Sequence, residues 1–198
     1  MKRWLALLAL LPLGACGYNR IQSLDEQASS AQSQIEVQLQ RRADLIPNLV
    51  NTVKGYAQHE EDVFIQVAQA RSGLLSAIKT GDAEQMANAN AQLSSSLGRL
   101  MVSVEAYPQL KADQSFIRLQ DELTGTENRI AVSRNDYNQA VNAYNSYIRQ
   151  FPAVLTAKMT GAKPRKYFTA SANAEGPPPT VDFSKPATPP PPATPKTP

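Results

Sequence analysis

The sequence predicts an all-α protein, an antiparallel bundle of long helices. Apolar residues recur at helical spacing through most of the chain, and sustained steps of seven appear in two stretches. Only nine of the 198 residues are glycine and 7% are aromatic, which favours helices over sheets. We expect four helices, or three if the first one is continuous and kinked at Pro47.

The first apolar series begins near residue 21 and contains a single charged residue, Arg42. Pro47 lacks an amide hydrogen and opposes the carbonyl four residues earlier, so it predicts either a boundary between two helices or a kink in one long helix. Asp44 would cap a new helix starting at Leu45. The series, in steps of seven, reads Ile21, Ala28, Ile35, Arg42, Leu49, Tyr56, Val63, Ala70 and Ala77.

The next boundaries are clearer. Gly81 and Asp82 supply a C-terminal glycine and an N-cap, so they predict a turn before a helix over residues 83–105. Pro108 ends that helix, and the last one begins between residues 109 and 115. Its seam has strict steps of seven, which predicts neighbours crossing at about 20° before Pro152 ends or kinks it. The seam residues are Phe116, Leu123, Ile130, Tyr137, Tyr144 and Phe151.

The N-terminus resembles a lipoprotein signal. Two cations precede a short apolar run, which is followed by Gly14, Ala15 and Cys16, the only cysteine of the chain. We interpret residues 1–15 as a cleaved signal peptide and Cys16 as the lipid attachment site; an ordinary signal or a buried structural thiol are the alternatives. The apolar run is shorter than the roughly 20 residues of a membrane-spanning helix. Gly17 after the cysteine favours the periplasmic side of the outer membrane in a Gram-negative host.

The C-terminus has a different composition. Ten of the fifteen prolines lie between Gly176 and Pro198. Proline excludes helix and inner strand, so residues 170–198 are predicted to form a disordered tail, either a solvated spacer or a ligand for a partner's aromatic groove. The helical bundle would then occupy residues 16–169.

The charge balance excludes a nucleic-acid-binding surface. The formal charge of +3 falls to +1 once Lys2 and Arg3 leave with the signal. Five cations near the end of the last helix form a candidate membrane-facing cluster, with a solvated helix terminus as the equal alternative. They are Arg149, Lys158, Lys163, Arg165 and Lys166, with no acid between Asp136 and Glu175.

No catalytic or metal site is predicted. The single histidine, His59, has no second histidine with which to form a zinc or di-iron motif. Neither a nucleophile motif nor a glycine-rich phosphate loop occurs. We therefore expect no enzyme activity and no cofactor apart from the covalent lipid.

Two polar groups interrupt the apolar pattern, one around Pro47 and one in the last helix. We favour satisfied structural networks that fix helix register; a recognition surface for a partner is the alternative. The residues are Arg41, Arg42, Asp44, Asn48, Asn51, Glu127, Asn128, Arg129 and Arg134.

The same regions carry a family pattern. The stretch from Gln40 to Val50, reading QRRADLIPNLV, and the later blocks YPQLKA, LQDEL and TENRIA resemble the LemA family, as do the Tyr-Asn pairs at 137 and 144. The resemblance covers about residues 17–168 and implies a helical bundle exposed outside the cytoplasm on a membrane anchor, without an established molecular function. Members usually have a transmembrane helix where this chain has a lipobox.

These observations predict a lipid-anchored protein of the cell envelope that acts as a non-enzymatic scaffold or protein-interaction module. Envelope or membrane proteins are the expected partners, and the coiled-coil-like faces are compatible with self-association. A purely structural envelope component, or a small-ligand binder or enzyme that uses a polar pocket, are the alternatives.

Overall fold

The computed structural model describes residues 2–57 and 59–170, with side chains from residue 17 onward. These residues form six helices and no strand: α1 (Lys2–Lys54), α2 (Glu61–Thr80), α3 (Ala83–Val104), α4 (Pro108–Lys111), α5 (Gln114–Tyr147) and α6 (Ala153–Thr160). The all-α prediction is confirmed. The predicted tail lies outside the described residues, except for Ala170.

Helix α1 passes through Pro47 without a break. The first helix boundary therefore lies at residues 55–60, not at Pro47, and Asp44 caps nothing: it is inside α1, where it accepts a hydrogen bond from Gln40. Proline leaves the Ala43 carbonyl without its usual helical donor. Arg71 of α2 fills this role, because its Nε donates to the Ala43 oxygen at 2.7 Å. A tertiary hydrogen bond thus replaces the backbone bond that Pro47 removes.

The later boundaries match their sequence signals. Gly81 adopts a positive φ of 67° at the end of α2, and the Asp82 carboxylate accepts hydrogen bonds from two backbone amides at the start of α3. Asp113 caps α5 in the same way. Helix α5 ends at Tyr147, before Pro152, so the seam prediction fails at its last member: the Phe151 side chain is 81% exposed.

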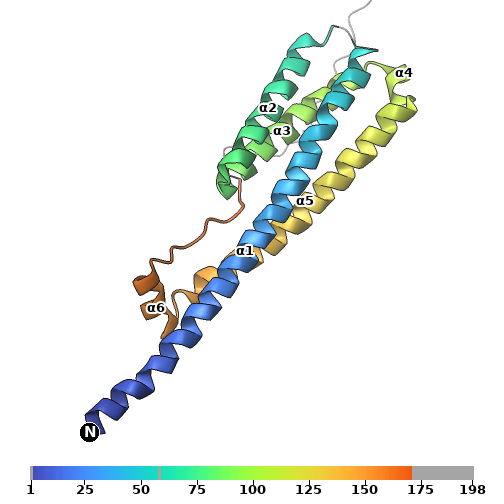
Figure 1. Cartoon of the computed structure of the whole chain (residues 1–198). Coiled ribbons are helices and arrows are strands. Elements are labelled where there is room, and N and C mark those ends of the chain that lie inside the picture. The colour runs from blue at the N-terminus through green and yellow to red at the C-terminus, as the bar shows by residue number, and fades with distance from the viewer. Residues whose placement is uncertain (1, 58, 171–198) are drawn as a thin grey trace, which may run out of the picture.

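The helices form a long rod with a shorter hairpin packed on it (Figure 1). Helices α1 and α5 lie side by side along most of their lengths, and α2 and α3 pack on each other and on the distal part of α1 (Figure 1). A large apolar core joins α1, α2, α3 and α5 in this distal part. A second, small core lies where α5 ends and α6 packs on α1, and it consists of Ile21, Leu24, Tyr144, Ile148 and Ala157.

An extended segment follows α6. We call residues 161–170 the strap. It runs from α6 back to the turn between α2 and α3 (Figure 1), and the Phe168 side chain is buried in the large core. The strap therefore joins the small core to the distal hairpin.

Candidate functional site

The one charged residue of the first apolar series is buried in the bundle. Arg42 lies among the core positions of α1 and is only 5% exposed. Its guanidinium forms an ion pair with Glu127 of α5 and donates to the side-chain oxygens of Asn90 and Ser94 of α3. Arg42 thus links three helices through one planar group whose donors are fixed in direction.

The buried positive charge of Arg42 is paired with one carboxylate, that of Glu127. Burial lowers the pKa of the Arg42 guanidinium, and the Glu127 carboxylate opposes that shift. The Arg42 Nε has no hydrogen-bond partner among the described residues. A pocket of about 280 Å³ beside the group has mixed walls that include Leu97, Met101 and Asn128. Because Glu127 already matches the positive charge, this geometry fits a register-fixing network better than an anion site.

The structure separates most of the other predicted network residues from Arg42. On α1, Arg41 and Asp44 line a shallow groove facing α2, and their side chains are exposed. On α5, Arg129 donates to the Gln38 side chain of α1. The remaining members are exposed: Asn48, Asn51, Asn128 and Arg134. Of the nine predicted residues, Arg42 and Glu127 form an ion pair, and Asn128 lines the pocket beside them.

The strap is held by asparagine side chains that the residue types alone did not single out. Asn145 pairs with the Arg165 backbone in both directions, donating to its carbonyl at 2.9 Å and accepting from its amide at 2.8 Å. Asn138, one step of seven earlier on α5, pairs in the same way with Phe168. Each asparagine side chain thus pairs with both the amide and the carbonyl of one extended residue, as the backbone of a neighbouring strand would. The sequence feature that could have indicated these contacts was the repeated Tyr-Asn pair at 137 and 144.

The predicted basic cluster is divided between two places. Arg149, Lys158 and Lys163 are exposed at or next to α6. Arg165 instead forms an ion pair with Asp25 of α1. Lys166 reaches the α2–α3 turn, where it pairs with Asp82 and Glu84, and its hydrogen bond lowers the pKa of the Asp82 carboxyl. The positive charges of Arg165 and Lys166 are thus paired with acidic residues of the bundle. Lys166 lies on the strap, away from α6.

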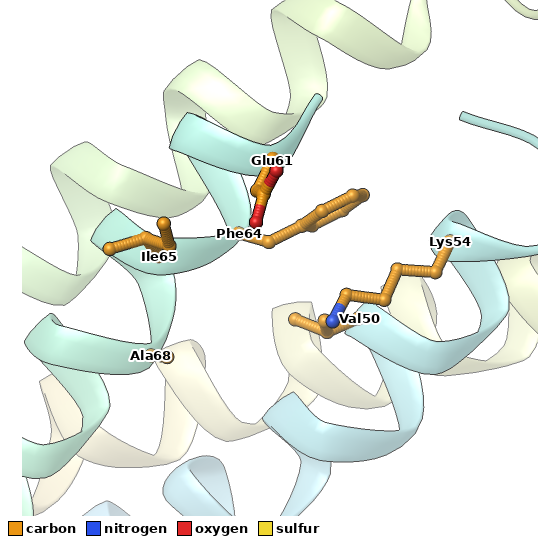
Figure 2. Close-up of a pocket in the computed structure, with 6 residues that line it drawn as sticks. All are labelled: Val50, Lys54, Glu61, Phe64, Ile65 and Ala68. Carbon is orange, nitrogen blue, oxygen red and sulfur yellow. The ribbon is translucent and has the colours of Figure 1, made fainter. Parts of the chain in front are cut away.

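A second pocket, of about 400 Å³, lies where α1 ends and α2 begins (Figure 2). Phe64 extends from α2 toward Lys54 of α1 (Figure 2), and the Lys54 ammonium lies 5.3 Å from the centre of the Phe64 ring. Val50, Ile65 and Ala68 supply apolar walls. The Lys54 ammonium already interacts with the Phe64 ring, and no buried polar group lines the pocket. The pocket therefore has no set of polar groups arranged to bind a ligand.

No catalytic constellation appears among the residues that the structure describes. His59 is exposed in the loop between α1 and α2. Within the same residues, no three histidine, cysteine or acidic side chains come together in a way that would hold a metal ion.

The predicted lipid site, Cys16, lies within α1, but its side chain is outside the described part. Gly17, the next residue, contacts α6 closely: a β-carbon there would lie 3.4 Å from the Thr156 hydroxyl. Across the described residues, none of the helices combines the length and the hydropathy that crossing a membrane requires.

Comparisons with known proteins agree with the resemblance. Residues 31–183 match the sequence model of the LemA family. The chain is 28% identical to magnetosome protein MamQ 2 of Paramagnetospirillum magneticum over 187 residues, which is 83% of this chain and 69% of that protein. MamQ of Magnetospirillum gryphiswaldense is 27% identical with the same coverage. Protein LemA of Metamycoplasma hominis is 26% identical over 67% of this chain and 60% of its own length.

Proposed function

This chain belongs to the LemA family, and on that premise we propose that it is a lipid-anchored protein of the cell envelope that acts as a non-enzymatic helical scaffold. One observation carries the proposal: Cys16 stands five residues before Ile21, the first residue of the small core, within one uninterrupted helix. A lipid on Cys16 would therefore be joined to the bundle without a flexible linker.

The length of α1 sets how far such a scaffold reaches. Cys16 and Lys54 are separated by about 57 Å at 1.5 Å per residue. The α2–α3 hairpin packs on the distal part of this rod (Figure 1). It would be presented well above the lipid headgroups, where a protein partner could reach it.

The interior supports a scaffold more than a ligand-binding or catalytic role. The distal core is a continuous apolar cluster, and its buried cation is matched by Glu127. Ligand sites are usually concave and combine apolar walls with convergent polar groups. The pocket beside Arg42 has such walls, but its two charged lining residues, Arg42 and Glu127, are already paired with each other.

The processed N-terminus tests the anchor. Mass spectrometry of the chain purified from membranes should find residues 1–15 absent and Cys16 carrying a thioether-linked diacylglycerol. Cys16→Ser is the matched control, because serine keeps the size and removes the thiol; it should keep the full 198 residues. A native chain that begins at Met1 with a free thiol would refute the proposal.

The membrane and the partners are tested separately. Gly17 favours the outer membrane, so Gly17→Asp should shift the lipidated chain toward the inner membrane on a density gradient. Cross-linking in intact cells, compared between the full chain and a chain ending at Ala170, distinguishes an interaction module whose tail recruits partners from a purely structural component. Unchanged cross-links after the deletion would show that the tail does not recruit partners. No reproducible cross-link, to another protein or to a second copy, would leave the structural alternative.

A further inference from the structure

Helix α6 and the turn just before it carry large apolar side chains that the bundle does not cover. Phe151, Leu155 and Met159 are 81%, 55% and 89% exposed. Leu155 and Met159 are four residues apart in α6, so they share one face of that helix, and Phe151 lies in the turn two residues before the helix begins. We call these three residues the α6 ridge. Burying such side chains is favourable, so a contiguous exposed group of them marks a contact surface.

The opposite face of α6 fixes the position of the ridge. Ala153 and Ala157 are buried, and Ala157 packs in the small core with Ile21 and Leu24 of α1. Thr156 lies against Gly17, directly after Cys16. The α6 ridge is therefore held next to the proposed lipid, and it faces away from α1.

The exposed charges that flank the ridge along the chain have one sign. Arg149, Lys158 and Lys163 are exposed there, and the sequence contains no acid between Asp136 and Glu175. Apolar side chains flanked by cations fit the boundary between acyl chains and anionic headgroups.

We propose that the α6 ridge is a second membrane contact, in which α6 lies in the interface of an anionic bilayer beside the lipid on Cys16. This rests on the proposed anchoring. A bilayer fits better than a second copy of the chain, because three side chains supply much less than the roughly 800 Å² per partner of a stable protein interface. Since the ridge faces away from α1, this contact would tilt the rod toward the side of α6.

A dye at a single new cysteine tests the contact locally. Lipidation consumes the Cys16 thiol, so Met159→Cys would carry the only free thiol of the mature chain. Val102→Cys on α3 is the matched control, because Val102 is an apolar residue with a similar exposure of 73%. Each full-length lipidated variant is labelled with a polarity-sensitive dye and reconstituted into vesicles of phosphatidylcholine and phosphatidylglycerol that contain acyl-chain quenchers.

We expect several-fold stronger quenching and a blue-shifted emission at position 159, and neither change at position 102. Lys158→Gln with Lys163→Gln should weaken the quenching at position 159 without changing the circular dichroism. Equal quenching at the two positions would overturn the proposal. So would concentration-dependent dimerisation in detergent that protects position 159, since a second copy would then cover the ridge.

The experiment distinguishes a failure of the proposed lipid anchor from a failure of the proposed α6 contact. Mass spectrometry before labelling reports on Cys16, whereas the quenching reports on α6. If Cys16 proves unmodified, the same two variants are compared in the full-length Cys16→Ser chain on the same vesicles, and the α6 proposal is judged by the same difference in quenching.

Discussion

The hydrogen bond between Arg71 and the Ala43 carbonyl yields the sharpest prediction about stability. Ala43 is fully buried, and Pro47 cannot supply the amide that would normally bond to its oxygen. Arg71→Met keeps much of the side-chain stem but removes the donor. A buried carbonyl left unpaired costs about 1–3 kcal/mol, so we expect the free energy of unfolding to fall by about 2 kcal/mol.

A double-mutant cycle isolates the cause. Pro47→Ala restores a backbone amide that can bond to the Ala43 oxygen, so Arg71→Met should cost less than about 0.5 kcal/mol in that background. The coupling energy between the two positions should be about 1–2 kcal/mol. For a denaturation slope near 2 kcal/mol per molar urea, Arg71→Met alone should lower the urea midpoint by about 1 M.

The control is Arg99→Met. The exposed Arg99 donates to the Gln66 side chain rather than to a buried carbonyl, so its loss should stay within about 0.5 kcal/mol. Urea unfolding followed by far-ultraviolet circular dichroism measures all the variants. If Arg71→Met costs the same with proline and with alanine at position 47, the donor-replacement reasoning is wrong.

Three further predictions concern the polar contacts. Glu127→Leu should destabilise the fold by about 1–3 kcal/mol because it leaves the buried Arg42 charge unpaired, and adding Arg42→Leu should recover most of the loss in the same urea titration; a larger loss in the double variant would contradict this. Asn145→Leu should free the strap, so hydrogen exchange of the strap amides should accelerate several-fold while the exchange of α1 amides is unchanged. The carboxyls of Asp82 and Asp113 have lowered pKa values, the first mainly through Lys166 and the second through the Phe116 amide. Since their folded pKa values lie below the unfolded values of about 3.9, the stability they add is present above that pH and is lost as the pH falls through the folded values. Thermal unfolding from about pH 6 to about pH 3 should therefore show a shallower acid decline in Asp82→Asn with Asp113→Asn, and an unchanged slope would refute that assignment.

Local sequence signals predicted most of the fold. The apolar steps of seven identify the seams of α1 and α5, because one face of each helix is buried along its length. Gly81 and Asp82 mark helix ends through their own backbone preferences and side-chain acceptors. Phe151 satisfies the same spacing but is exposed, because α5 ends at Tyr147 and the spacing then has no helix to act on.

The candidate sites were only partly predictable. Arg42 stood out as the one charge in an apolar series, and the structure buries it. The sequence did not indicate that its partners would be Asn90, Ser94 and Glu127, from helices far along the chain. Nor did it indicate that Lys166 would leave the basic cluster for Asp82, since that contact depends on the path of the strap.

By itself, the sequence determined the helical class, the turn at Gly81 and Asp82, the end of α3 before Pro108 and the single lipidation candidate, because these depend on periodicity, caps and residue chemistry within a few positions of one another. Tertiary structure alone decided that α1 continues through Pro47, that the strap binds the asparagines of α5, and that the α6 ridge stays uncovered. Each of these depends on whether a segment distant in the chain places a donor, an acceptor or an apolar surface at that position. The residues within a few positions do not specify which distant segment packs there.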